Sequence, residues 1–138
     1  MNKLLYSLLA ATWCSLAQAE IAVIVHPSSA IDALTEDDVA RLYLGKSKSF
    51  PNGDQATPLN QEEGSATRQA FHEQVTKKNP SQYKAYWSQL VFTGKGTPPK
   101  EAANDGAVKS MVAANPGTIG YIDAGAVDSS VKVVMKVP

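Results

Sequence analysis

The feature that most constrains the fold is a run of five apolar residues, Ile21-Ala-Val-Ile-Val25, with no polar residue between them. A strand that faces water on one side alternates apolar and polar residues. A continuous run rich in β-branched residues is instead typical of a strand covered on both faces, as in parallel sheets. We therefore expect a sheet with helices packed on both of its faces.

The rest of the chain alternates further strand patterns with helix patterns. Polar caps, apolar residues three and four positions apart, and glycine or proline stops indicate four helices. The helices are expected after Thr35, after Gly64, from Pro80 and after Asn104, and the further strands at 56–60, 118–122 and 131–137. Strands separated by helices predict one layered α/β domain, with a mixed sheet if the C-terminal strand runs antiparallel.

The composition excludes several classes of function. Thirteen basic and thirteen acidic residues cancel to a formal net charge of zero, so there is no basic surplus for binding nucleic acid. One cysteine and two histidines are too few for a disulfide framework, a cysteine-rich zinc site or a multi-histidine metal centre. We expect no metal, no cofactor and no nucleic-acid partner, so any ligand must be held by hydroxyls, carboxylates, cations and backbone amides.

Residues 1–19 have the pattern of a secretory signal peptide. Lys3 provides a positive start, the stretch 4–16 is mostly apolar, and Ala17-Gln18-Ala19 is the small-x-small pattern that signal peptidase cleaves. The apolar stretch is shorter than the roughly 20 residues of a membrane-spanning helix. The sequence therefore predicts a periplasmic protein with no membrane anchor after cleavage and a single domain at 20–138.

One short motif, Gly64-Ser65-Ala66-Thr67-Arg68, combines several groups that bind oxyanions. The first N–H groups of a helix lack partners within the helix and carry partial positive charge. Ser65 and Thr67 add hydroxyls, Arg68 adds a cation, and Gly64 permits close approach of the backbone. The same residues also form a good helix cap, in which the Ser65 side chain bonds the backbone N–H near Arg68. Both interpretations stay open at this point.

Two other features also have a structural and a functional interpretation. An aromatic and apolar stripe follows one face of the third expected helix, and it either packs against the sheet or stacks on a ligand. Its members are Tyr83, Tyr86, Trp87, Leu90 and Val91. Ser28 and Ser29 follow the first strand, and they either form an ordinary turn or line a ligand site, because ligands gather beyond the carboxyl ends of strands in open α/β sheets.

Four stretches resemble the periplasmic phosphate-binding proteins of ABC transporters. They follow the family's order and lie at 34–46 (LTEDDVARLYLGK), at 60–71 around Gly-Ser-Ala-Thr, at 86–87 (Tyr-Trp) and at 115–122 (NPGTIGYI). The resemblance implies a single three-layer lobe of the type II periplasmic binding protein fold, with phosphate or a similar tetrahedral oxyanion as ligand. In that family the ligand is held by an Arg-Ser-Asp-Gly-Ser-Gly-Thr loop at a helix N-terminus.

The match to this ligand loop is partial. Gly64, Ser65 and Thr67 match the family's pattern. Ala66 replaces a glycine, and Gln61 stands where the loop's arginine would be. The main fixed cation of the family's site is therefore missing, and Arg68 is the residue that could replace it.

Two further features weaken an anion site here. The carboxylates of Glu62 and Glu63 outnumber the guanidinium of Arg68, so an anion meets repulsion unless these carboxylates face solvent. The family encloses its ligand between two lobes, whereas residues 20–138 provide one, so water screens the attraction. We expect weak binding unless a second copy or a partner completes the enclosure.

We expect a binding protein rather than an enzyme. Gly64-Ser65-Ala66 is not a nucleophile elbow, His26 has no partner in the sequence, and His72 is expected at the surface. The expected function is binding of phosphate or a similar oxyanion, with an ABC transporter or a receptor as protein partner. The alternative is a periplasmic interaction or sensory module that keeps the fold without the ligand and docks through its sheet edge or its aromatic stripe.

Overall fold

The computed structural model describes residues 20–138, so the predicted signal peptide at 1–19 lies outside the described residues. Within the described range no helix is long and apolar enough to cross a lipid bilayer. The elements follow in the order β1 (Ile21–Val25), α1 (Glu36–Tyr43), β2 (Thr57–Gln61), α2 (Ala66–Gln74), α3 (Pro80–Phe92), β3 (Lys100–Ala102), α4 (Asp105–Ala114), β4 (Thr118–Asp123), a 3-10 turn (Ala124–Ala126) and β5 (Lys132–Val137).

The strands form one mixed sheet in the order β3-β2-β4-β1-β5. β2 is parallel to both β3 and β4, whereas β1 is antiparallel to both β4 and β5. The predicted burial of β1 on both faces is confirmed, since all five of its residues are buried. Its direction differs from the parallel arrangement that the apolar run suggested, because burial depends on the helices that cover the strand and not on the direction of its neighbours.

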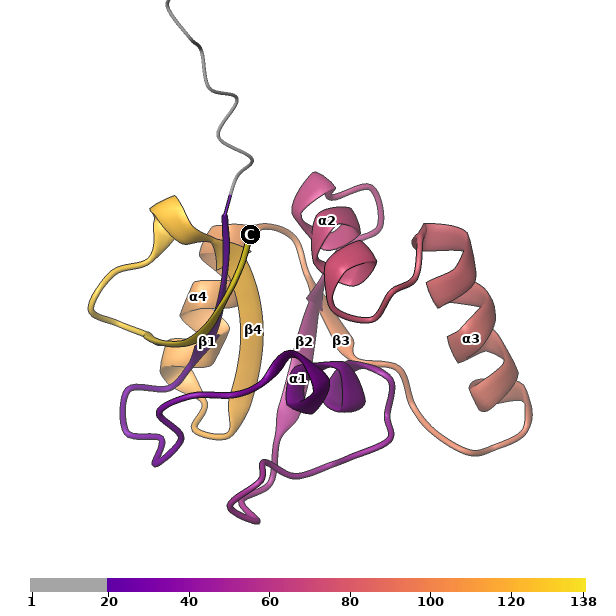
Figure 1. The fold of residues 1–138 in the computed structure, drawn as a ribbon, viewed down its shortest axis with the longest axis horizontal. Coiled ribbons are helices and arrows are strands. Elements are labelled where there is room, and N and C mark those ends of the chain that lie inside the picture. The colour runs from indigo at the N-terminus through magenta and orange to yellow at the C-terminus, as the bar shows by residue number, and fades with distance from the viewer. Residues whose placement is uncertain (1–19) are drawn as a thin grey trace, which may run out of the picture.

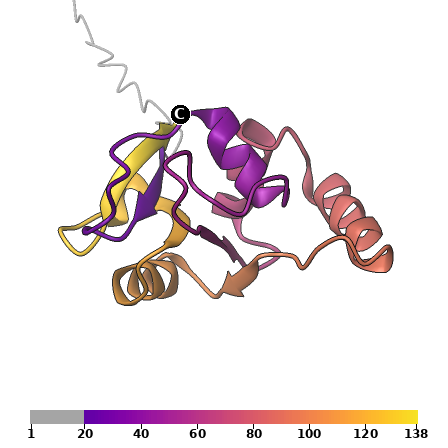
Figure 2. The same ribbon diagram turned by 90° about the horizontal axis from the view of Figure 1, so that it is seen from below.

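Helices cover both faces of this sheet, as Figures 1 and 2 show. On one face, Val39 and Tyr43 of α1 and Phe71 of α2 pack on β1 and β4 in the larger apolar core. On the other face, Val108 and Val112 of α4 pack on β1, β2 and β4 in a second core. The predicted three-layer α/β domain with a mixed, helix-flanked sheet is therefore confirmed.

The helices begin where their capping residues predict. Thr35 caps α1 and Asn79 caps α3, each in a reciprocal capping box with the residue three positions later, and Asn104 caps α4. The helical part of α1 ends just before Gly45, whose φ of 70° lies in the left-handed region that favours glycine. These local signals place the four helices along the chain without reference to the tertiary structure.

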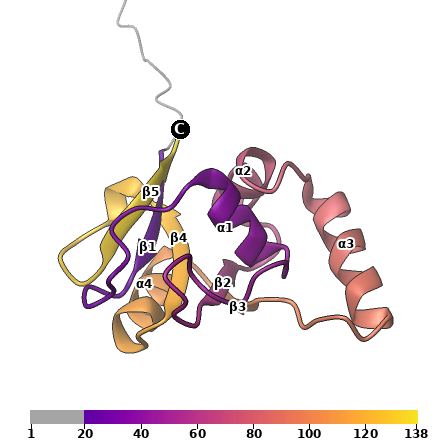
Figure 3. The same cartoon turned by 60° about the horizontal axis from the view of Figure 1, so that its bottom comes forward.

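α3 stands apart from the sheet at one end of the molecule, which Figure 3 shows from a third direction. Tyr83 and Trp87 of its aromatic stripe are buried, as the core interpretation predicts. They pack with Leu44, which follows α1, in a cluster separate from the two cores on the sheet. The stripe therefore anchors α3 to the end of α1 instead of to the sheet face, and it leaves Val91 51% exposed and Phe92 91% exposed.

Candidate functional site

The predicted oxyanion motif lies where β2 ends and α2 begins. The chain leaves β2 at Gln61 and turns through Gly64, which has a φ of 92°. α2 then starts at Ala66 with Ser65 as its N-cap residue. The glycine supplies the left-handed turn that this short connection requires, so the fold places the motif at a helix N-terminus as predicted.

The Ser65 side chain acts as a helix cap. Its Oγ accepts a hydrogen bond from the Arg68 backbone N–H at 3.1 Å and donates to Gln61 Oε1 at 2.7 Å. The capping interpretation of the motif is therefore confirmed, and the hydroxyl hydrogen is already used within the protein. An added anion would compete with Gln61 for this donor.

Gln61, which stands where the related family has an arginine, is buried and fully bonded. Its Nε2 donates to Asp105 Oδ1 at 2.6 Å and to the Tyr121 carbonyl at 3.1 Å. Its backbone N–H donates to the Tyr121 hydroxyl at 3.0 Å. The amide thus links β2 to α4 and β4, and its donors point into the protein instead of toward a ligand.

The Arg68 guanidinium is also held by the protein itself. Its Nη1 donates to the Gln61 carbonyl at 2.7 Å and to Glu101 Oε2 at 2.9 Å, and the guanidinium lies 5.5 Å from the centre of the Tyr83 ring. The Arg68 side chain is 13% exposed, whereas that of Glu101 is 45% exposed. Because a carboxylate already neutralises it, Arg68 is a poor substitute for the family's ligand arginine.

Thr67 lies on a different side of α2 from Ser65 and Arg68. Thr67 and Ala66 line a hollow with Ile21 and Pro138, at the two ends of the described chain. The motif's two hydroxyls are therefore separated by the helical turn and do not converge on one point, although they are two residues apart in the sequence.

Backbone amides are the oxyanion donors that stay free. Among residues 20–138, the N–H groups of Gly64, Ala66 and Thr67 have no hydrogen-bond acceptor. The amides of Ala66 and Thr67 are the first two of α2, where the helix dipole places partial positive charge. Gly64 and Ala66 are exposed, so an anion can reach this turn from solvent.

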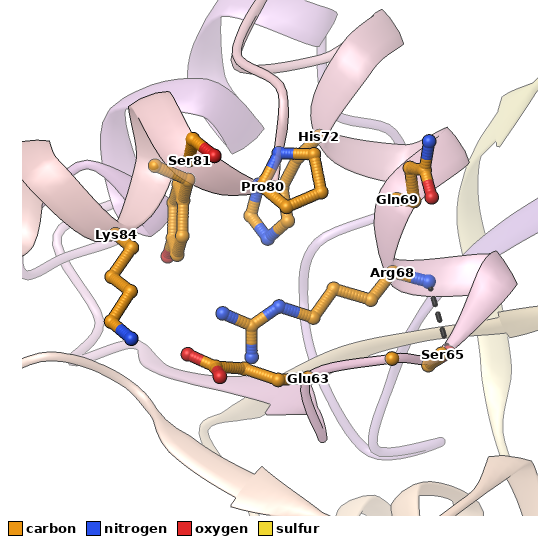
Figure 4. Close-up of a pocket in the computed structure, with 10 residues that line it drawn as sticks. Glu63, Ser65, Arg68, Gln69, His72, Pro80, Ser81 and Lys84 are labelled. Atoms are coloured by element: carbon orange, nitrogen blue, oxygen red, sulfur yellow. Dashed lines mark hydrogen bonds between the residues drawn. The ribbon is translucent and has the colours of Figure 1, made fainter.

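A pocket of about 310 Å³ adjoins the motif, between α2 and the start of α3. Figure 4 shows the side chains of Arg68 and Glu63 on one side of it and that of Lys84 on the other, where α3 also contributes Pro80 and Ser81. Lys84 and Glu63 line the pocket and form no ion pair within 4.0 Å among residues 20–138, and the Arg68 beside them is paired with Glu101. The pocket is therefore close to electrically balanced, which suits a polar ligand better than a strongly charged one.

A buried polar network behind this pocket was not expected from the sequence. Asn60 Oδ1 accepts from His72 Nε2 at 2.9 Å and from the Tyr121 hydroxyl, and Asn60 Nδ2 donates to the Tyr83 hydroxyl at 3.1 Å. Because Asn60 Oδ1 can only accept, these partners assign the proton of a neutral imidazole to Nε2. Every member of the network comes from a different element, so no local pattern could reveal it.

The prediction that His72 lies at the surface is wrong. The residue is 2% exposed, and its ring packs beside Tyr43, Phe71, Tyr83 and Tyr121. Burial, followed by the nearby charge of Arg68, lowers the pKa of His72 from 6.5 to about 3. Burial likewise raises the pKa of Tyr83 to about 12. Both groups are neutral at physiological pH, and the network serves to position β2, α2 and α3 relative to one another.

Ser28 and Ser29 are not brought together with the motif. β1 runs antiparallel to β4, so its carboxyl end, where these serines follow, lies at the opposite edge of the sheet from the carboxyl end of β2. The Ser28 hydroxyl lies 2.7 Å from His26 Nδ1, and the Ser29 hydroxyl accepts from the Ile31 N–H. The expectation that they share the ligand edge assumed a parallel β1, and that assumption is wrong.

Within residues 20–138, no group of three or more histidine, cysteine, aspartate or glutamate side chains could hold a metal ion. The polar groups at the α2 N-terminus are amides, one capping hydroxyl and an ion pair. This arrangement can bind and orient a ligand.

Comparison with solved structures identifies the fold. A protein from Clostridium perfringens, described as a phosphate ABC transporter substrate-binding protein and solved with bound phosphate, matches with a TM-score of 0.68 and 28% identity, over 84% of this chain and 45% of its own. An ABC-type phosphate transport receptor from Vibrio cholerae matches with a TM-score of 0.68 and 19% identity, over 85% of this chain and 47% of its own. PstS from Borrelia burgdorferi matches with a TM-score of 0.63 and 16% identity, over 84% of this chain and 47% of its own. No protein-family model matches the sequence, and a search of curated proteins finds no match.

These matches confirm the predicted resemblance. Residues 20–138 have the fold of part of the phosphate-binding proteins of ABC transporters, a lobe of the periplasmic binding protein type. The chain spans about half the length of the proteins that it matches.

Proposed function

We propose that residues 20–138 form an exported lobe that binds phosphate or a similar tetrahedral oxyanion at the N-terminus of α2. The observation that carries this proposal is the set of free backbone amides at Gly64, Ala66 and Thr67, at the turn where β2 meets α2. The fold supports it, since the Clostridium perfringens protein with the same fold was solved with bound phosphate.

Binding at this turn would depend on neutral donors. Hydrogen bonds to a charged group contribute about 1.5–3 kcal/mol each, and the helix dipole adds about 0.3–1 kcal/mol at an exposed terminus. Glu62 and Glu63 are exposed, and in water a like charge about 7 Å away costs about 0.6 kcal/mol. After the entropy of association is subtracted, we expect a dissociation constant of roughly 1 mM, or about −4 kcal/mol.

The signal peptide predicted from residues 1–19 supports a periplasmic location in this proposal, with an ABC transporter or a receptor as the protein partner. A second copy or that partner would enclose the open turn and exclude water from it. Enclosure strengthens each interaction with the anion, because the effective dielectric constant falls.

The test removes one amide without removing a side-chain contact. Ala66 is the first residue of α2, and Ser65 before it has the extended backbone that precedes proline, with φ of −67° and ψ of 126°. Proline is tolerated at this helix position, so Ala66→Pro removes the N–H and keeps the helix. The control is Glu36→Pro, at the first position of α1, whose cap Thr35 is also extended; this change also removes the exposed ion pair between Glu36 and Lys77, which lies away from the α2 N-terminus.

Phosphate and sulfate are titrated into ¹⁵N-labelled residues 20–138, and amide chemical shifts are followed. In the unmutated chain we expect saturable shifts at Gly64, Ala66 and Thr67. Ala66→Pro should bind phosphate about fivefold to tenfold more weakly, corresponding to the loss of about 1–1.4 kcal/mol of binding free energy. Glu36→Pro should bind phosphate with unchanged affinity. Equal affinities in all three proteins, or shifts confined to other residues, would contradict the proposal.

A further inference from the structure

A further hollow lies at the other end of the sheet from the N-terminus of α2. This groove has a volume of about 540 Å³ and adjoins the beginning of β2 at Thr57 and Pro58, whereas the oxyanion turn follows the end of that strand. One wall is the loop after α1, at 44–48, and the other is the loop between α3 and β3, at 95–100. Nothing in the proposed oxyanion binding uses this surface.

The floor of the groove is apolar and rigidly held. The half-buried side chains of Tyr86 and Leu90 supply its accessible surface. Trp87, which is 6% exposed, lies beneath them between two glycines: a Cβ atom at Gly45 would come within 2.6 Å of the indole ring, and one at Gly96 within 3.2 Å. The Trp87 N–H donates to the Tyr43 carbonyl at 3.1 Å, and the Tyr86 hydroxyl donates to the Leu44 carbonyl at 2.6 Å. The aromatic groups are therefore fixed before any ligand arrives.

The rim of the groove carries four lysines and no carboxylate. Lys46 and Lys48 come from one wall, and Lys95 and Lys100 come from the other. All four are exposed, and none lies within 4.0 Å of a carboxylate among the described residues. The nearest acidic residue along the chain from Lys100, Glu101, is already bonded to Arg68.

Most of the other lysines among residues 20–138 are paired. Lys77, Lys109, Lys132 and Lys136 each form an ion pair within 4.0 Å, whereas Lys78 and Lys84 form none. The groove thus concentrates uncompensated positive charge in a chain whose formal net charge is zero. Clustered like charges repel one another, and a ligand of opposite charge relieves that repulsion.

We propose that this groove docks an extended acidic segment of a partner protein. A segment that alternates carboxylates with apolar side chains satisfies both the lysine rim and the aromatic floor. A small anion such as phosphate leaves the floor in contact with water, and a flat anionic membrane does not reach a floor that lies between two walls.

The edge of the sheet supports an extended occupant. β3 begins at Lys100, on the rim of the groove, and it is an edge strand whose one neighbour in the described sheet is β2. Its other edge offers backbone donors and acceptors to an incoming strand, which is a common mode of peptide recognition. Main-chain pairing would position the segment while the lysines select for its charge.

The test uses a fluorescein-labelled, capped peptide of alternating glutamate and leucine, and the same peptide with lysine in place of glutamate. Binding to residues 20–138 is followed by fluorescence anisotropy. We expect the glutamate peptide alone to bind, with an affinity about tenfold weaker when the salt concentration rises from about 0.02 M to 0.2 M, because salt screens the lysines.

Variants locate the binding. Lys46→Gln combined with Lys95→Gln removes one charge from each wall and should weaken binding at least about fivefold. Lys77→Gln combined with Lys136→Gln removes the same charge elsewhere and should change affinity less than about twofold. All four side chains are exposed, so circular dichroism should show both proteins folded.

Three results would overturn the proposal: equal binding by both double variants, equal binding of the lysine peptide, or no binding of either peptide. Phosphatidylglycerol vesicles or inorganic phosphate that bind through Lys46 and Lys95 while the glutamate peptide does not would also overturn it, in favour of a membrane or a small anion. The phosphate shifts at Ala66 should be the same in the groove variant, so that failure here is distinguishable from failure of the proposed function.

Discussion

Lowering the pH from 7 to 5 should destabilise the folded chain chiefly through His72. The ring is buried among four aromatic side chains, and its pKa is lowered from 6.5 to about 3 by burial and then by Arg68. Above pH 6.5 the ring is neutral in both the folded and the unfolded chain, so the full stability is present. As the pH falls from 6.5 toward 3, the unfolded chain binds a proton that the folded chain does not, and stability is lost.

The size of the loss follows from the two pKa values. Each pH unit well below 6.5 removes about 1.4 kcal/mol of the free energy of unfolding, until the folded chain also binds the proton. Between pH 7 and pH 5 the loss amounts to about 2 kcal/mol. Carboxylates contribute little in this window, because their ordinary pKa values lie near 4. For a domain that is stable by about 5–15 kcal/mol, the effect is readily measured.

The assay is urea unfolding of residues 20–138 at pH 7, 6 and 5, followed by the fluorescence of Trp87. His72→Gln removes the ionisable ring but keeps a side-chain amide that can donate toward Asn60, so its free energy of unfolding should change little between pH 7 and 5. His26→Gln removes the other histidine, which lies in the turn after β1, and should retain the dependence of the unmutated chain. A dependence that persists in His72→Gln would refute this reasoning.

Three further predictions concern stability and binding. Gly45→Ala should lower the free energy of unfolding by about 2–3 kcal/mol, because Gly45 has a φ of 70° and its new Cβ would lie 2.6 Å from Trp87. Gly53→Ala, at a φ of 92° with no atom within 4 Å, should lower it by about 1 kcal/mol in the same urea assay. Equal losses in the two variants would rule out the contact with Trp87 as the cause. Asn60→Leu should lower the free energy of unfolding by about 3 kcal/mol at pH 7, because it leaves the His72 Nε2–H and the Tyr121 hydroxyl buried without an acceptor. A loss below about 1 kcal/mol would mean that apolar packing replaces the network easily. Arg68→Met should lower stability by about 1–2 kcal/mol, yet change phosphate affinity in the amide-shift titration less than about twofold, since Glu101 already neutralises the guanidinium; an affinity loss of tenfold or more would place Arg68 at the ligand.

Local patterns predicted most of the elements. The Thr35 cap, the Ser65 cap and the apolar run at 21–25 each act over a few residues, so their effects survive any change in the surrounding fold. The short strand β3 at Lys100–Ala102 was missed, because three residues, two of them charged, carry no periodic signal. It exists because β2 offers a parallel edge at Leu59–Gln61.

The candidate site was predicted in position but not in chemistry. The sequence alone placed Gly64 to Arg68 at a helix N-terminus, and the structure agrees. The partners that occupy its side chains come from far along the chain: Gln61 bonds Asp105, 44 residues away, and Arg68 bonds Glu101, 33 residues away. No spacing rule connects such residues, so the Arg68 cation and the Gln61 amide could not be recognised as already engaged, whereas the Ser65 cap, whose partners lie within four residues, could be foreseen.

Local sequence patterns predict where helices start and stop, which strand is buried on both faces, and that the domain is a layered α/β domain, because hydrogen bonding and apolar periodicity act between near neighbours. Tertiary structure alone decided that β1 runs against its neighbours, that His72 is buried and neutral, and that four lysines share one groove. These properties depend on contacts between segments that are distant in the sequence, and such contacts form only when the sheet brings those segments together.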